Sequence, residues 1–203
     1  MEFSALAILG LGFALGLKHA TDADHVVAVT TFVSEQRSVW RGLWIGLFWG
    51  LGHTLSLTAA GLLVVFLKIS IPEWVALRLE FAVAFMLVIL GVRVIVHRHE
   101  QIRRWHAHFG LRPLAAGMVH GAAGSAALML LVLSTLPSGW LALFYISVFG
   151  AGSLIGMLAI SLLLSAPMYW AARHSPNIFN RIQLAAGAFS CAFGLYLGFN
   201  LII

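Results

Sequence analysis

The chain has 203 residues, of which 61% are hydrophobic and only 9% are charged. An ordinary soluble domain has about 25% charged residues, and 12 basic plus 7 acidic side chains cannot cover a soluble protein of this size. The composition therefore excludes a soluble globular domain, a disordered chain and a disulfide scaffold, and it favours an all-α polytopic membrane protein. We attribute the net charge of +5 to basic loops beside apolar spans rather than to nucleic-acid binding.

Long apolar runs divide the chain into predicted membrane spans. A helix needs about 20 apolar residues to cross a bilayer. The sequence predicts six transmembrane helices, at Ser4–Val33, Leu43–Leu67, Trp74–Val96, Leu114–Leu136, Trp140–Tyr169 and Ile182–Ile202. The first and the fifth are long enough to tilt or to break.

The basic residues predict the orientation of these spans. Nine of the twelve fall on one side, namely Arg37, Arg41, Arg93, Arg98, Arg103, Arg104, Arg112, Arg173 and Arg181. Only Lys68 and Arg78 fall on the other side, and Lys18 lies within a span. Because cytoplasmic loops carry the excess of lysine and arginine, we expect an inner (plasma) membrane protein with both termini outside the cytoplasm.

The first span contains an unusual polar cluster of Lys18, His19, Asp22, Asp24 and His25. Each charged side chain there costs about 2.5–3.5 kcal/mol on insertion scales, so such groups are expected to face a protein interior and a partner. Two carboxylates and two imidazoles form a ligand set for a divalent cation. The alternative is a membrane-embedded salt-bridge network without an ion.

The spacing of this cluster does not fit one straight helix. Lys18, Asp22 and His25 share a helix face, whereas His19 and Asp24 lie about 140° apart. Either the helix is unwound here, as in transporters with broken helices, or the residues serve different steps. We expect Lys18 to pair with Asp22, which leaves Asp24 for the metal.

Three short segments recur at nearly one offset. They are Gly16–His19 with Gly117–His120, Gly50–His53 with Gly150–Ser153, and Glu80–Gly91 with Gln183–Gly194, at offsets of 101, 100 and 103 residues. Halves of three spans each must insert in opposite senses, which is an architecture typical of secondary transporters. The sequence therefore predicts one permease domain, 1–203, with inverted repeats at about 1–97 and 113–203 and a basic cytoplasmic loop at about 98–112.

Further histidines lie outside the first cluster. His53 and His120 occupy predicted spans, and the repeat places His120 opposite His19, so we include both as candidate metal ligands. Four more histidines lie at or in the basic loop, at His97, His99, His106 and His108. Because the neighbouring arginines repel cations, we interpret these four as incidental rather than metal-collecting.

These segments resemble a known family. The stretch His19–His25 has the His-x4-Asp-His form of the nickel/cobalt transporter family, and Trp49–Thr54 is similar to its second motif. Gly117–Ala126 looks like a segment of its short, UreH-like bacterial branch. The resemblance implies import of Ni²⁺, with Co²⁺ as the second substrate, by His19, Asp24 and His25 as core residues with Asp22 and His53 close to them.

The resulting hypothesis is a transmembrane permease and not an enzyme. The metal ion is substrate, and no prosthetic group and no catalytic residue are expected. The expected partners are the divalent ion and the lipid bilayer, while homo-oligomerisation and a cytoplasmic metallochaperone stay open. The alternatives are a divalent metal exporter of the same superfamily and an intramembrane zinc hydrolase, which the absence of a His-Glu-x-x-His pattern disfavours.

Overall fold

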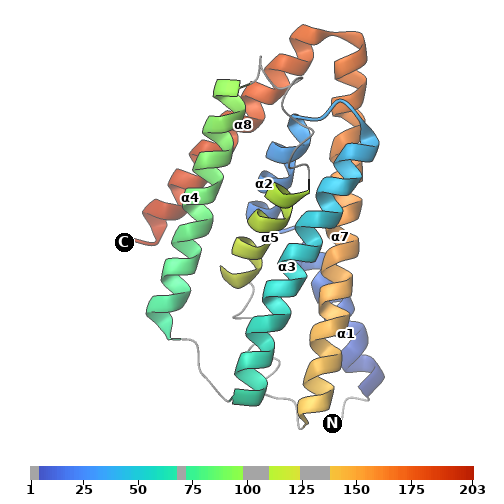
Figure 1. The fold of residues 1–203 in the computed structure, drawn as a ribbon, viewed down its shortest axis with the longest axis vertical. Coiled ribbons are helices and arrows are strands. Elements are labelled where there is room, and N and C mark those ends of the chain that lie inside the picture. The colour runs from blue at the N-terminus through green and yellow to red at the C-terminus, as the bar shows by residue number, and fades with distance from the viewer. Residues whose placement is uncertain (1–4, 68–71, 98–109, 124–137) are drawn as a thin grey trace.

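The computed structural model describes residues 5–67, 72–97, 110–123 and 138–203, and within these ranges the chain is helical with no strands (Figure 1). The helices are α1 (Ala5–His19), α2 (Ala23–Ser34), α3 (Val39–Leu67), α4 (Glu73–His97), α5 (Leu111–Ala123), α7 (Gly139–His174) and α8 (Pro176–Asn200). The all-helical prediction is confirmed for this part of the chain.

Four of these helices, α3, α4, α7 and α8, are long and apolar enough to cross a membrane. Long apolar helices are therefore confirmed where spans were predicted, at Leu43–Leu67, Trp74–Val96, Trp140–Tyr169 and Ile182–Ile202. The last helix begins earlier than predicted, because the Ser175 side chain caps it by accepting from the Ile178 amide at 3.3 Å. Pro176 follows in the first turn, where its missing N–H costs no hydrogen bond.

The first predicted span is two helices, because α1 ends at His19 and α2 begins at Ala23. The amides of Thr21 and Asp22 donate to carbonyls three residues back, at 2.9 and 3.0 Å. Asp22 then has an extended backbone, with φ −61° and ψ 145°. The Thr21 hydroxyl donates to the Lys18 carbonyl at 2.6 Å, which helps to satisfy the backbone at the break. This outcome was one of the two that the spacing left open.

The fourth predicted span is only partly described. Helix α5 covers its first ten residues, and the remainder, 124–136, lies outside the described ranges. The count of six transmembrane helices is therefore not tested. The fifth predicted span is one unbroken helix, α7, which contains Pro167 and continues to His174.

The helices pack as neighbouring pairs around a central layer. Helix α4 packs against α8, α1 packs against α7, and α3 packs against both α5 and α7. Figure 1 shows α2 and α5 between the α4–α8 pair on one side and α1, α3 and α7 on the other. Most residues of α2 are buried, whereas α5 also carries exposed residues such as Leu111 and Met118.

Glycines permit two of these helix pairs to touch through their backbones. Gly16 of α1 faces the Phe149 carbonyl of α7, and Gly117 of α5 faces the Trp49 carbonyl of α3. A β-carbon at either glycine would collide with that oxygen. Small residues at such crossings are how membrane helices approach closely, and here they bring α1 against α7 and α5 against α3.

Contacts between side chains tie one end of the bundle together. The Arg93 guanidinium near the end of α4 lies 3.6 Å from the carboxylate of Glu35, the residue after α2. Arg37 lies over the ring of Phe179 at the start of α8, 5.0 Å from its centroid. The α2–α3 connection, the end of α4 and the start of α8 therefore share one end (Figure 1).

Candidate metal centre

The break in the first span places His19 beside Asp22. The Nδ1 atom of His19, the last residue of α1, lies 2.8 Å from Oδ2 of Asp22. The predicted pairing of Asp22 with Lys18 is wrong: Lys18 is exposed and makes no ion pair within the described residues. The physical reason is that α1 ends between these residues, so the contact between residues four apart on a helix does not form.

Asp24 bridges two histidines in the first turn of α2. Its Oδ1 atom lies 3.1 Å from Nδ1 of His25 and accepts from the His25 amide at 2.9 Å. Its Oδ2 atom lies 2.9 Å from Nε2 of His120 on α5. Asp24 therefore contacts two imidazoles, and its carboxylate also belongs to a group of side chains that could hold a metal ion.

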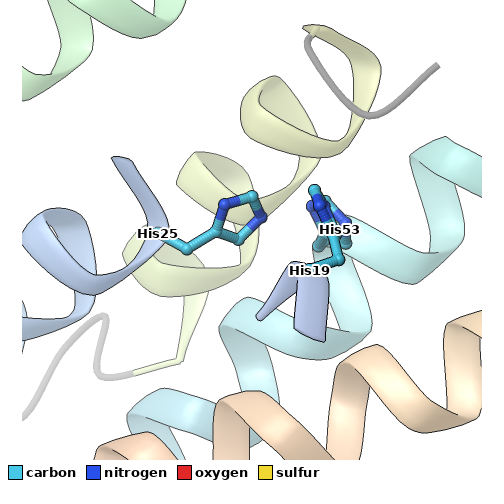
Figure 2. Close-up of side chains that lie close together, drawn as sticks. All are labelled: His19, His25 and His53. Atoms are coloured by element: carbon cyan, nitrogen blue, oxygen red, sulfur yellow. The ribbon is translucent and has the colours of Figure 1, made fainter. Parts of the chain in front are cut away.

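His53 brings a third helix to the same point. It lies in α3 with 0% of its surface exposed, and neither ring nitrogen has a hydrogen-bond partner among the described residues. Its ring centroid is 5.2 Å from that of His19 and 5.0 Å from that of His25. Figure 2 shows these three rings approaching one another from α1, α2 and α3.

The six predicted residues gather in one place, and they offer two sets of donors suited to a metal ion. One set is His19, His25 and His53, and the other is Asp24, His25 and His120; within each set the donor atoms lie within 4.8 Å of one another. Asp22 belongs to neither set but holds His19.

Several nitrogens of the centre are buried without a hydrogen-bond partner in the described part of the chain. They are Nε2 of His19, Nε2 of His25, both nitrogens of His53 and Nδ1 of His120. A buried polar atom without a hydrogen bond costs about 1–3 kcal/mol. A bound cation would remove that cost, and carboxylates on the opposite nitrogens of His19 and His25 are the arrangement that orients metal-binding imidazoles.

Aromatic side chains form the apolar wall of the centre. The Trp49 ring lies 5.3 Å from the His120 ring, and the Phe149 ring lies 5.6 Å from the His19 ring. We did not single out Phe149 from the sequence. The repeat offset of 100 residues from Trp49, the first residue of the second motif, is the signal that could have identified it.

The histidines of the basic loop take no part in this centre as far as they are described. His97 ends α4, and its Nδ1 lies 3.3 Å from the Arg93 carbonyl. His99, His106 and His108 lie outside the described ranges.

Comparison with known proteins places the chain in a family. No family model and no solved structure matches it. The urease accessory protein UreH of Bacillus sp. (strain TB-90) is 38% identical to it, in an alignment that covers 98% of this chain and 94% of the relative. Such identity over nearly the full length of both chains is the mark of common family membership. This chain therefore belongs to the family of the urease accessory protein UreH.

Proposed function

We propose that this protein is a membrane permease that imports Ni²⁺, with Co²⁺ as a second substrate, through the His/Asp centre. The observation that carries the proposal is the convergence of His19, His25 and His53, with buried unpartnered nitrogens, at a helix break among apolar helices. Broken helices that expose polar groups near the midplane are how secondary transporters build ion sites.

We assign the primary ion position to His19, His25 and His53. The hydrogen bonds from Asp22 to His19 and from Asp24 to His25 occupy one nitrogen of each ring and leave Nε2 for the ion. The two carboxylates also balance the double positive charge within an apolar bundle, which lowers the cost of desolvating the ion. The second set, Asp24, His25 and His120, is the position that the ion occupies before or after this one.

The choice of nickel rests on family likeness rather than on geometry. Imidazole and carboxylate donors suit Ni²⁺, Co²⁺, Zn²⁺ and Cu²⁺ alike. The relative's name ties it to urease. The motifs at His19–His25 and Trp49–Thr54 resemble those of nickel/cobalt transporters, and this resemblance favours nickel.

Contacts that recur between the two predicted halves support an inverted repeat, and with it transport by alternating access. Backbone contacts recur at offsets of 100 or 101 residues: Gly16 with Phe149 and Gly117 with Trp49, then Gly152 with Phe13 and Gly52 with Leu114. Two halves with the same crossings in opposite senses can rock about a site between them. This pattern of contacts is what favours the repeat boundaries of about 1–97 and 113–203.

The direction follows from the proposed orientation. The bundle end that carries Arg37 and Arg93 is cytoplasmic by the excess of basic residues, which places the start of α4 outside. A membrane potential that is negative inside favours inward movement by about 2.3 kcal/mol per charge for each 100 mV. Import of a divalent cation therefore needs no nucleotide hydrolysis by this chain.

The test is uptake of 63Ni²⁺ by cells that express the protein, beside His19→Ala and His53→Ala. We expect both variants to fall to the empty-vector level at equal membrane abundance. The matched control is His97→Ala, a histidine of the same chain outside the centre, and it should keep wild-type uptake.

Two other results would contradict the proposal. Cellular nickel below the empty-vector level would indicate export. No change for nickel, cobalt or zinc, with tightly bound zinc in the purified protein, would indicate an intramembrane zinc enzyme.

A further inference from the structure

A cavity of about 180 Å³ lies beside the metal centre. It is lined by Asp24 of α2, Glu80 and Val83 of α4, Ala123 of α5, and Leu197 and Leu201 at the end of α8. Its described lining therefore has two carboxylates on an otherwise apolar wall. The volume accommodates several water molecules, which is room for a divalent ion that retains part of its hydration.

Asp24 connects this cavity with the metal centre. The side chains of His25, His53 and His120 are almost fully buried, whereas 29% of the Asp24 side chain is exposed. Asp24 lines the cavity and also contacts His25 and His120 through its two oxygens. An ion in the cavity would thus meet the Asp24, His25 and His120 donor set first, and the three-histidine set next.

No ion pair or hydrogen bond with the described residues accounts for the Glu80 carboxylate in the apolar helix α4. It lies seven residues into α4, about 10 Å from the helix start, and it makes no ion pair or hydrogen bond with the described residues. A carboxylate in an apolar span is costly unless it faces a cavity or a counter-charge, and such residues mark ion pathways. A passing cation would supply the missing counter-charge.

We propose that this cavity is the entrance by which a divalent cation reaches the histidine centre, and that Glu80 is the receiving carboxylate. This inference rests on the proposed transport function. The cavity lies toward the ends where α4 starts and α8 finishes, which is the outer side in the proposed orientation. Apolar walls around negative charges concentrate cations and raise their association rates, so Glu80 acts on ion capture and not on ligation at the centre.

The first test compares Glu80→Gln with Glu73→Gln. Glu73 is an exposed acid in the first turn of the same helix and does not line the cavity. We expect Glu80→Gln to raise the Ni²⁺ concentration for half-maximal uptake about ten-fold, with the maximal rate retained and equilibrium Ni²⁺ affinity in detergent changed less than about three-fold. Glu73→Gln should match the wild type in both measurements.

The outcomes separate an entrance from other roles. Wild-type uptake by Glu80→Gln would overturn the inference, as would an equal loss of equilibrium affinity, which would make Glu80 a ligand. If the wild type transports, His53→Ala does not, and Glu80→Gln is unaffected, this inference fails while the transport function stands. If the wild type itself moves no metal, the proposed function fails instead.

The second test measures access of water to the cavity. In a Cys191→Ala background, we expect Leu197→Cys to react with a membrane-impermeant cationic methanethiosulfonate from outside, and Ni²⁺ to slow that reaction. Phe189→Cys is the control, because Phe189 is exposed on the same helix but does not line the cavity and should face lipid. A Leu197→Cys thiol that reacts only from inside, or not at all, would overturn the inference.

Discussion

Two helix crossings in this molecule have similar packing and different chemistry. At one crossing, Gly117 of α5 lies against the backbone of α3 at Trp49, one turn before His53; at the other, Gly16 of α1 lies against α7 at Phe149, one turn before Ser153. The histidine belongs to a donor set, whereas the buried serine hydroxyl has no hydrogen-bond partner within the described ranges. Packing thus accounts for the glycines at both crossings, while the residue one turn further along the partner helix is a metal donor at only one of them.

The most severe change converts one crossing into the other. We expect His53→Ser to reduce Ni²⁺ uptake by more than about 100-fold, because loss of a ligand exceeds the 10- to 100-fold effect of losing a supporting contact. Ser153→Ala is the matched control and should keep uptake within about two-fold. Uptake of 63Ni²⁺ at equal membrane abundance measures both, and a transporting His53→Ser variant would remove His53 from the ion path.

The shared packing can be tested with one substitution in each crossing. Gly16→Val and Gly117→Val should each lower the free energy of unfolding by about 1–3 kcal/mol or more, because the added side chain does not fit between two backbones in contact. Gly10→Ala is the control, since nothing lies within 4 Å of its β-carbon position. Thermal unfolding in detergent provides the measurement. If only one of the two valine variants is destabilised, the crossings are not equivalent.

The carboxylates distinguish positions within the centre. Asp22→Asn and Asp24→Asn should each weaken Ni²⁺ affinity by about 10- to 100-fold, because each carboxylate orients an imidazole. The loss should be greater for Asp24, which contacts two histidines, than for Asp22, which contacts one. Titration calorimetry on the purified protein compares them. The reverse order would indicate that the His19–Asp22 pair dominates binding.

The smallest effect is expected at Lys18, which we first assigned as the partner of Asp22. Because Lys18 is exposed and makes no ion pair in the described part of the chain, Lys18→Met should change Ni²⁺ affinity by less than about two-fold. The same titration serves, with Asp22→Asn as the reference. A loss as large as that of Asp22→Asn would restore the pairing that the spacing suggested.

The predictions that held depend on signals local in the sequence. Apolar runs long enough to cross a bilayer located α3, α4, α7 and α8. The conflict in spacing between His19 and Asp24 gave a break in the first span as one of two alternatives. The partners of Asp22 and Asp24 could not be predicted, because they depend on the backbone turn at the break. The meeting of His53 and His120 with His25 depends on how α3 and α5 pack, which periodicity does not encode.

The role proposed for Glu80 could not be predicted from the sequence either. In the sequence Glu80 is one acid in an apolar run, and we identified it there only as the first residue of a repeated segment. Its position on the cavity wall with Asp24 arises because α2, α4, α5 and α8 meet there. No spacing rule relates residues on four separate helices.

His25 belongs to both donor sets, and this sharing limits how many ions the centre can hold. A neutral imidazole has one lone pair for coordination, because its other nitrogen carries the proton. While His25 ligates an ion in one set, the other set is incomplete. Under the proposed function we expect one ion per chain. Uptake should then saturate along a simple hyperbola with a Hill coefficient of about one, and Co²⁺ should inhibit Ni²⁺ uptake by pure competition.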